Sequence, residues 1–175
     1  GLGDVYKRQV YDVDNIIRIG SAGAFDDDLN LMDIVLGMGS CTDSNFAAQY
    51  NLPGIYAPIA DFTLLKTAYD VAEEKHFWVK VGNVLASDVF YNDDTTVNDR
   101  WKKMGVLAVD MESAALYMTA ARCRKHALTI LTISDHLYRG EKLSAQERQI
   151  GFTNMMETAL ETAVRLQNNR QMEDL

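Results

Sequence analysis

The sequence is poor in cysteine, in proline and in positive charge. Its 175 residues include only two cysteines, Cys41 and Cys123. These are too few and too far apart for a disulfide framework or a zinc site, so we expect small buried side chains in a reducing compartment. The net charge of −8 argues against nucleic-acid binding, because phosphates attract a basic face. An anionic small substrate would therefore need positive charge supplied within its own site.

Long apolar runs and targeting signals are also missing. No apolar run approaches the roughly 20 residues of a membrane span, and no secretory signal is visible, so we expect a cytoplasmic protein. Segment 1–9 lacks an initiator methionine and shares no periodicity with the residues after it, and we interpret it as non-native or artefactual sequence. One domain is expected over residues 10–168, with a frayed tail over 169–175.

Strand-like and helix-like patterns alternate along the chain. The expected strands cover 16–19, 33–40, 77–86, 106–109 and 127–133, and the expected helices cover 61–76, 96–103, 111–124 and 144–168. Both prolines fall in a long loop over 42–58, and the three aspartates at 26–28 predict a solvated turn in preference to a metal site. The alternation predicts an α/β layer fold with a mostly parallel or mixed sheet.

A carboxylate follows the end of the last predicted strand. Asp135 follows two positions after the β-branched apolar run 127–133, and ligands of open α/β sheets bind beyond the carboxyl ends of the strands. Arg148 follows a helix-start signal, Ser144 with Glu147 three residues later, and could reach back to Asp135. The alternative is that Asp135 caps a turn or a helix.

An arginine interrupts the first predicted strand. A guanidinium at position 18 is costly there unless an anion pairs with it. Gly20 and Gly23 follow in a predicted loop, where backbone N–H groups and the Ser21 hydroxyl could point at one phosphate. The alternative is an internal salt bridge with a nearby aspartate.

Two further segments carry chemistry at predicted strand ends. Asp110 and Glu112 lie at a strand-to-helix junction, where the helix dipole favours negative charge. Asp110 could serve only as an N-cap, whereas Glu112 could accept two sugar hydroxyls. Phe90 and Tyr91 could stack on a flat base, although aromatic residues in such positions are more often part of a core.

Taken together, these segments resemble the hexameric bacterial purine nucleoside phosphorylases of the nucleoside phosphorylase superfamily. The resemblance is carried by residues 18–24, 37–44, 87–91, 109–117, 133–136 and 147–149. It is collinear from about Val10 to about Val164 and covers the later two thirds of a family chain. It implies a mixed central sheet flanked by helices in three layers, truncated at its N-terminus. The missing third normally carries a Gly-Asp-Pro-x-Arg phosphate loop, together with a His and an Arg that reach a neighbour's site.

The resemblance also implies an activity and partners. The reaction would be reversible phosphorolysis of purine (2′-deoxy)ribonucleosides to free purine and (deoxy)ribose 1-phosphate, a pentosyl transfer used in purine salvage. Inorganic phosphate would be the co-substrate, with no metal or other cofactor. The complete protein would be a homohexamer, a trimer of dimers, without nucleic-acid or membrane partners.

The roles of individual residues follow from the same resemblance. Asp135 would be the general acid toward purine N7, with Arg148 moving in to assist it during catalysis. The other groups would be Arg18 and Ser21 for phosphate, Met111, Glu112, Asp110 and Tyr91 for ribose, and Phe90, Val109 and Ser134 for the base. Family members usually carry Glu where this chain has Asp110, and this shorter side chain puts its ribose contact in doubt.

Three alternatives stay open at this stage. Methylthioadenosine/adenosylhomocysteine nucleosidases use water in place of phosphate, and Arg18 argues against them. Uridine phosphorylases read uracil with a Gln and Arg pair that has no clear counterpart in this sequence. The third alternative is a truncated, inactive fragment that only binds nucleoside.

Overall fold

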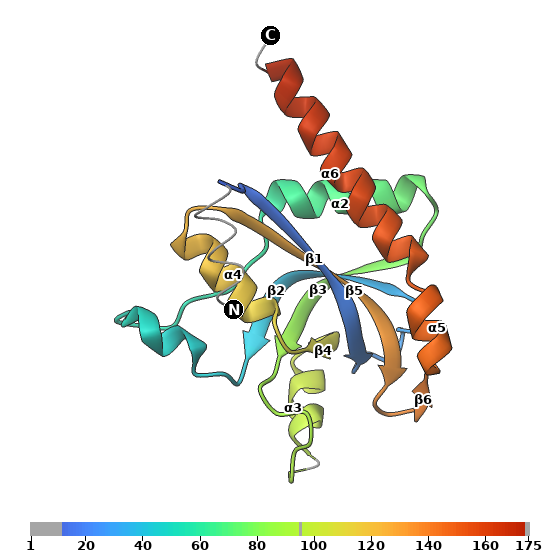
Figure 1. The fold of residues 1–175 in the computed structure, drawn as a ribbon. Helices are drawn as coiled ribbons and strands as arrows, with labels where there is room; N and C mark the ends of the chain where they lie inside the picture. Colours follow the sequence, from blue (N-terminus) through green and yellow to red (C-terminus); the bar gives the residue numbers. More distant parts are fainter. Residues whose placement is uncertain (1–11, 95, 174–175) are drawn as a thin grey trace.

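The computed structural model describes residues 12–94 and 96–173, so the segment 1–9 that we interpret as non-native lies outside the described residues. Among these residues, none of the helices combines the length and the apolar character needed to cross a membrane. The elements in chain order are β1 (Asn15–Ala24), β2 (Ile34–Thr42), the 3-10 helix η1 (Phe46–Tyr50), α2 (Phe62–Glu74), β3 (Val79–Ala86), α3 (Val97–Lys103), β4 (Ala108–Asp110), α4 (Ser113–Arg122), β5 (His126–His136), β6 (Glu141–Lys142), α5 (Ala145–Ile150) and α6 (Thr153–Glu173) (Figure 1).

The strands form one mixed sheet that closes on itself. Their order is β1-β4-β3-β2-β5-β6, and β1 pairs in addition with β5. The β1–β5, β2–β3 and β3–β4 pairs are parallel, whereas the β1–β4 and β2–β5 pairs are antiparallel. The predicted mixed sheet is confirmed. Its closure between β1 and β5 leaves these two strands side by side, with their carboxyl ends at the same edge.

Helices cover both faces of the sheet, as the resemblance implies. Leu128 and Ile130 of β5 pack in one cluster with side chains of α2 and α6. The neighbouring Ala127 packs in a different cluster with Tyr117 and Ala120 of α4. Because successive side chains of a strand point to opposite faces, α4 lies on the other side of the sheet from α2 and α6 (Figure 1). The three-layer arrangement is therefore confirmed.

Local sequence signals account for the start of α2. The Asp61 side chain accepts a hydrogen bond from the backbone N–H of Leu64 at 2.9 Å, which satisfies one of the free donors of the first turn. The apolar side of the helix is buried, with Leu64, Leu65, Ala68, Val71 and Ala72 in the core. The helix predicted over 61–76 is confirmed with an Asp N-cap.

Two features of the predicted element pattern are wrong. Residues 20–24 are not a loop, because β1 continues to Ala24 in register with β5. The helix predicted over 144–168 is two helices, separated after Ile150. A Cβ at Gly151 would lie 2.5 Å from the Glu147 carbonyl oxygen and 2.6 Å from Cε of Met32, so glycine is required at this break.

The predicted start of this helical region is confirmed, and its end lies further along the chain than predicted. Ser144 and Glu147 form the expected capping box at the start of α5, each accepting a backbone hydrogen bond from the other. The backbone of α6 remains helical to Glu173, and so enters the segment 169–175 that we expected to be frayed.

A buried tyrosine ties α4 to two strands. The Tyr117 hydroxyl donates to the Gly37 carbonyl oxygen and accepts from the Thr129 N–H at 3.0 Å. Burial raises the pKa of Tyr117 to about 12, so the hydroxyl keeps its proton at neutral pH. A Cβ at Gly37 would lie 3.2 Å from this hydroxyl, which explains glycine at that point of β2.

Substituting Tyr117→Phe is expected to lower the free energy of unfolding by about 1–3 kcal/mol, because two buried backbone groups lose their partner. Urea unfolding followed by circular dichroism measures the change. Tyr56→Phe, at a residue with 37% exposure, is the matched control and should leave the unfolding midpoint unchanged. An equal effect of both substitutions would contradict a bridging role of the Tyr117 hydroxyl.

Candidate active site

Arg18 is held between two carboxylates that are distant in sequence. Its Nη1 lies 3.1 Å from Oδ2 of Asp110, and its Nη2 donates to Oε2 of Glu112. The Asp110 side chain is 0% exposed and that of Glu112 is 59% exposed. A Cβ at Gly20 would lie 3.1 Å from both Nη atoms, so Gly20 gives the guanidinium room above β1. The internal salt bridge that we considered therefore exists, although its partners are not the aspartates at 26–28.

Asp110 is held in place by Ser113, the first residue of α4. Its Oδ1 accepts from the Ser113 hydroxyl at 2.6 Å, and its Oδ2 accepts from the Ser113 N–H at 3.1 Å. The Ser40 hydroxyl lies 2.8 Å from that of Ser113 and extends the buried network. Burial raises the pKa of Asp110, while the hydrogen bond from Ser113 and the charge of Arg18 act in the opposite direction without cancelling the rise. Asp110 thus has both a capping contact and a charged partner.

Asp135 lies at the end of β5 beside a hydroxyl and an arginine. Its Oδ1 accepts from the Ser134 hydroxyl at 2.7 Å. Nη2 of Arg148 lies 3.7 Å from the same oxygen, beyond normal hydrogen-bond distance, while its Nε donates to the Leu143 carbonyl oxygen at 3.3 Å. Asp135 is paired within the sheet to Gly23 and Lys142, so it is not a helix cap.

A row of three residues crosses the sheet at this edge. Gly23 is in register with Val109 of β4 on one side and with Asp135 of β5 on the other. Residues directly opposite each other on paired strands share a face of the sheet. A Cβ at Gly23 would lie 3.0 Å from Oδ2 of Asp135, so the glycine leaves space between Val109 and the carboxylate.

Two charged groups, Arg18 with its carboxylate partners and Asp135 with Arg148, lie along one stretch of β1. Gly20 below the guanidinium and Gly23 beside the Asp135 carboxylate are about 10 Å apart at the rise of a strand. Side chains at 18 and 23 start on opposite faces of β1. However, β4 pairs with β1 only at Gly23 and Ala24, and Arg18 reaches Asp110 and Glu112 where this pairing has stopped. Among the described residues, no ion pair or hydrogen bond joins Arg18 directly to Asp135.

The two candidate aromatic residues are surface residues. Phe90 is 74% exposed and Tyr91 is 89% exposed, and their rings meet edge to face at 4.9 Å. They lie in the loop after β3, so the alternative that they belong to the core is wrong. Ser21 and Met111 are also exposed, while Val109 is half-buried and Ser134 is buried.

The loop with these aromatic residues is anchored by a carboxylate that sequence reasoning missed. Asp43 accepts from the Ser87 hydroxyl at 2.6 Å and from the Asp88 N–H at 2.9 Å. The only signal for Asp43 was its place in the segment 37–44. Ser40 and Ser113 were missed too, because a buried hydroxyl network has no periodicity that a sequence displays.

The aspartates at 26–28 form ion pairs. Lys80 lies 2.7 Å from Oδ1 of Asp26 and 3.2 Å from Oδ2 of Asp28, and Lys102 lies 2.6 Å from Oδ1 of Asp27. Within residues 12–94 and 96–173, no group of three or more His, Cys, Asp and Glu side chains is placed to hold a metal ion. The side chains of Asp27 and Asp28 are 72% and 81% exposed, so the turn is solvated, as expected, and its charges are matched by lysines.

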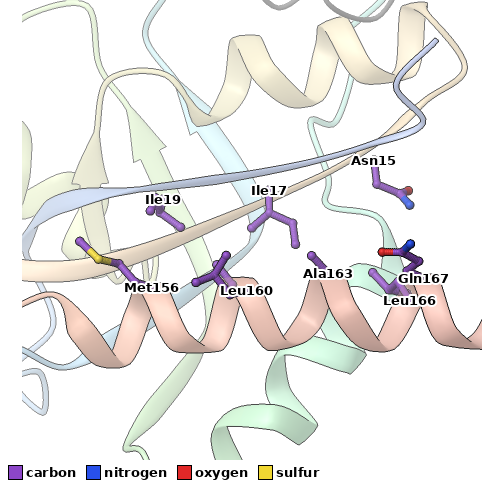
Figure 2. Close-up of a pocket in the computed structure, with 9 residues that line it drawn as sticks. Asn15, Ile17, Ile19, Met156, Leu160, Ala163, Leu166 and Gln167 are labelled. Carbon is purple, nitrogen blue, oxygen red and sulfur yellow. The ribbon is translucent and has the colours of Figure 1, made fainter. Parts of the chain in front are cut away.

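An apolar groove of about 610 Å³ lies elsewhere, between β1 and α6. In Figure 2, Ile17 and Ile19 of β1 face Met156 and Leu160 of α6. Because Arg18 lies between these two isoleucines, its side chain leaves the opposite face of the strand. No charged side chain of the described part of the chain lines the groove, so it is separate from the two charged groups.

Comparison with known proteins identifies the family of the chain. A sequence profile described as the Phosphorylase superfamily matches residues 7–166. The chain is 51% identical over 156 residues to "Purine nucleoside phosphorylase DeoD-type 2" of Aliivibrio fischeri, covering 89% of this chain and 66% of that protein. It is 50% identical to the protein of that name from Vibrio cholerae, with the same coverage. It is 47% identical over 160 residues to "Purine nucleoside phosphorylase DeoD-type" of Clostridium beijerinckii, covering 91% and 68%.

The chain spans about two thirds of the length of these curated relatives. The matched region contains all residues of both charged groups. The chain therefore belongs to the phosphorylase superfamily, as a relative of the DeoD-type purine nucleoside phosphorylases.

Proposed function

We propose that the protein to which this chain belongs catalyses reversible phosphorolysis of purine nucleosides. The observation that carries the proposal is the arrangement along β1 of a guanidinium at Gly20 and a carboxylate at Gly23, in a chain about 50% identical to proteins named purine nucleoside phosphorylases. The C1′–N9 bond of the nucleoside breaks, a phosphate oxygen forms a new bond to C1′, and the purine leaves with the bonding electrons.

Arg18 is the proposed phosphate-binding residue, and the exposed Ser21 hydroxyl, three residues further along β1, is proposed to contribute to the same site. In the structure the charge of Arg18 is matched by Asp110 and Glu112. A phosphate that takes the place of Glu112 on Nη2 releases this exposed carboxylate. Glu112 is then free to accept hydrogen bonds from the 2′- and 3′-hydroxyls of ribose, with Met111 and Tyr91 packed near the sugar.

Asp110 has a supporting part in this proposal. Its side chain is 0% exposed and both of its oxygens are engaged by Ser113, so it is poorly placed to contact ribose. It holds Nη1 of Arg18 and leaves Nη2 for the anion. The missing methylene relative to Glu is thus compensated by a buried hydrogen-bond network.

The base is proposed to lie over Gly23. Val109 lines one side of this position and Asp135 the other, and Phe90 contributes an exposed ring. Asp135 delivers the proton to purine N7, which neutralises the charge that develops on the leaving base. Ser134 orients the carboxylate, and Arg148 needs to move only a short distance from 3.7 Å to form a hydrogen bond with it.

The proposal has a direct test with the 175-residue chain. We expect cleavage of inosine to hypoxanthine to be slow, because the missing third carries part of the phosphate site, and to require inorganic phosphate, while uridine stays intact; chromatography separates the products. Turnover that does not depend on phosphate would assign a nucleosidase, and preferential cleavage of uridine would assign a uridine phosphorylase. Calorimetric titration with inosine in phosphate buffer then distinguishes a chain that binds nucleoside without cleaving it from one that neither binds nor cleaves it. A chain that neither binds nor cleaves inosine would contradict the proposal.

Gly23→Ala is expected to lower kcat for inosine by about tenfold or more, because the new Cβ would push against Oδ2 of Asp135 and occupy the position proposed for the base. Initial rates measure the effect. Gly54→Ala is the matched control, because a Cβ there would meet nothing within 4 Å, and it should keep the full rate. Equal rates for both variants would contradict the proposed position of the base over Gly23.

Three finer statements belong to the same proposal. The reaction needs inorganic phosphate as co-substrate and no metal or other cofactor. We place it in the cytoplasm, which is supported by the two free, half-buried cysteines. The complete protein is proposed to be a homohexamer, built as a trimer of dimers, that serves purine salvage.

A further inference from the structure

The buried network behind Arg18 joins four elements of the fold. Ser40 of β2 contacts Ser113 at the start of α4. Ser113 contacts Asp110 at the end of β4, and Asp110 faces Arg18 of β1. Ser40 and Ser113 are 4% and 0% exposed, so bulk water does not compete for their hydroxyl groups. Neither serine belongs to the residues proposed for phosphate, ribose or base, and their role in the network needs a separate explanation.

The hydroxyl protons of this network have one consistent order. An ionised carboxylate only accepts hydrogen bonds, so the Ser113 hydroxyl donates its single proton to Oδ1 of Asp110, at 2.6 Å. The Ser113 oxygen then accepts from the Ser40 hydroxyl, 2.8 Å away. Burial raises the pKa of Asp110, and the hydrogen bond from Ser113 opposes this rise more strongly than the charge of Arg18 does. Ser113 is therefore the stronger of these two partners of the Asp110 carboxylate.

The orientation of the Asp110 carboxylate follows Ser113 and not Arg18. Its Oδ1 accepts from the Ser113 hydroxyl, and its Oδ2 accepts from the Ser113 N–H at 3.1 Å. Nη1 of Arg18 lies 3.1 Å from Oδ2, yet among the described residues this buried nitrogen has no hydrogen-bond partner of good geometry. A carboxylate that was free to turn would align with the guanidinium, since these two groups favour a pair of parallel hydrogen bonds.

We propose that Ser113, supported by Ser40, is a positioning residue for the proposed phosphate-binding arginine: it holds Oδ1 of Asp110, so that Asp110 cannot engage both Nη atoms of Arg18. Only Oδ2 then faces the guanidinium, at Nη1. Nη2 pairs instead with the exposed carboxylate of Glu112, which is the partner that a phosphate would replace. This inference rests on the proposed function, because it takes Arg18 as the residue that binds phosphate.

The substitution Ser113→Ala in the 175-residue chain tests this role. Without the hydroxyl, Asp110 should turn and form two hydrogen bonds with Arg18. The affinity for inorganic phosphate should then fall by about tenfold, the scale of one hydrogen bond to a charged group. The loss should appear in KM for phosphate more than in kcat for inosine cleavage, because no group that acts on the base or on C1′ is changed. Calorimetric titration with inorganic phosphate and initial rates at varied phosphate concentration measure these effects.

Thr119→Val is the matched control for Ser113→Ala. It removes a hydroxyl from another buried residue of α4, 7% exposed, that has no contact with Asp110 in the network described above. It should leave both phosphate affinity and kcat unchanged. Circular dichroism checks that both variants are folded. Equal losses of phosphate affinity in the two variants would assign the effect to the packing of α4 and overturn the proposal.

Asp110→Asn shows whether Ser113 acts through Asp110. A neutral amide forms no bidentate ion pair with a guanidinium, so adding Ser113→Ala to Asp110→Asn should cause no further loss of phosphate affinity. A loss of the same size in both backgrounds would mean that Ser113 acts independently of Asp110, which contradicts the proposal.

A crystal structure of Ser113→Ala gives a readout that needs neither phosphate nor nucleoside. We expect both carboxylate oxygens of Asp110 to lie within about 3.2 Å of the Nη atoms of Arg18. A carboxylate that keeps its present orientation would overturn the proposal. If the carboxylate turns, but the unmodified chain neither binds phosphate nor requires it to cleave inosine, the proposed function fails and the control of Arg18 by Ser113 stands.

Discussion

Asp135→Asn is expected to lower kcat for inosine phosphorolysis by about 10²–10⁴-fold, the range contributed by a positioned general acid. Asparagine keeps the size of the side chain and can still accept from Ser134, but it has no proton to give to purine N7. Since the Ser134 hydroxyl donates to Oδ1 at 2.7 Å, the side chain should keep its position. The fold should therefore be unaffected, and the loss should appear in kcat more than in KM.

A substrate already methylated at N7 separates this role from a structural one. The base of 7-methylinosine carries its positive charge before the bond breaks, so it needs no proton from the enzyme. We expect Asp135→Asn to cleave it at nearly the rate of the unmodified chain, whereas inosine cleavage is lost. Asp88→Asn, at an exposed carboxylate of the neighbouring loop, is the control and should cleave both substrates normally. Equal losses on inosine and 7-methylinosine would rule out proton donation by Asp135.

Arg18→Ala is expected to abolish saturable phosphate binding and to lower kcat/KM for phosphate by about 10²-fold or more, because charge-assisted hydrogen bonds to the anion are lost. Calorimetric titration with inorganic phosphate and initial rates measure the two effects. Glu112→Gln should act in the opposite direction on phosphate, since it removes the carboxylate that is paired with Nη2 of Arg18. The affinity of the Glu112→Gln variant for nucleoside should fall, because an amide oxygen is a weaker acceptor for the ribose hydroxyls than a carboxylate.

The same Arg18→Ala substitution should also destabilise the fold, by about 3 kcal/mol at neutral pH, because it leaves the buried Asp110 carboxylate without its charged partner. The charge of Arg18 acts to lower the pKa of Asp110, so the pKa of Asp110 rises further in the variant. A carboxyl group whose pKa is raised in the folded state costs stability as the pH rises, and this cost disappears once the group is protonated in both states.

The destabilisation by Arg18→Ala should therefore be smaller near pH 4 than at pH 7. Urea unfolding at both pH values measures it. Arg100→Ala, which removes an exposed partner of Asp94, should change stability by less than about 1 kcal/mol at either pH. A destabilisation by Arg18→Ala that grows toward low pH would contradict the assignment of the effect to Asp110.

Much of the local structure was predictable from short stretches of sequence. The cap at Asp61, the capping box at Ser144 and the β-branched run before Asp135 each depend on neighbours within a few residues. The loop predicted at 20–24 was wrong for a related reason. Glycines are typical of loops, but here they make room for the side chains of Arg18 and Asp135 above a continuous strand.

The candidate site was predictable as a set of residues but not as an arrangement. Arg18 was identified because a guanidinium in a strand needs an anion, yet its partner Glu112 lies 94 positions away. The nearby aspartates at 26–28 were equally plausible partners, and they pair instead with Lys80 and Lys102. Ser40, Asp43 and Ser113 lie in segments that carry the resemblance, but no local pattern assigned them a role, because their importance comes from the groups that they contact.

The sequence alone determined the alternation of strands and helices, the places where most of them begin and end, and the residue types available for chemistry, because these depend on periodicity and on contacts within one or two turns of chain. Only the tertiary structure decided that β1 pairs with both β4 and β5, and that Val109, Gly23 and Asp135 form one row. Strand pairing is set by the burial of apolar faces over the whole chain. Which charges meet at the carboxyl ends of the strands is decided by that closure and by no single segment.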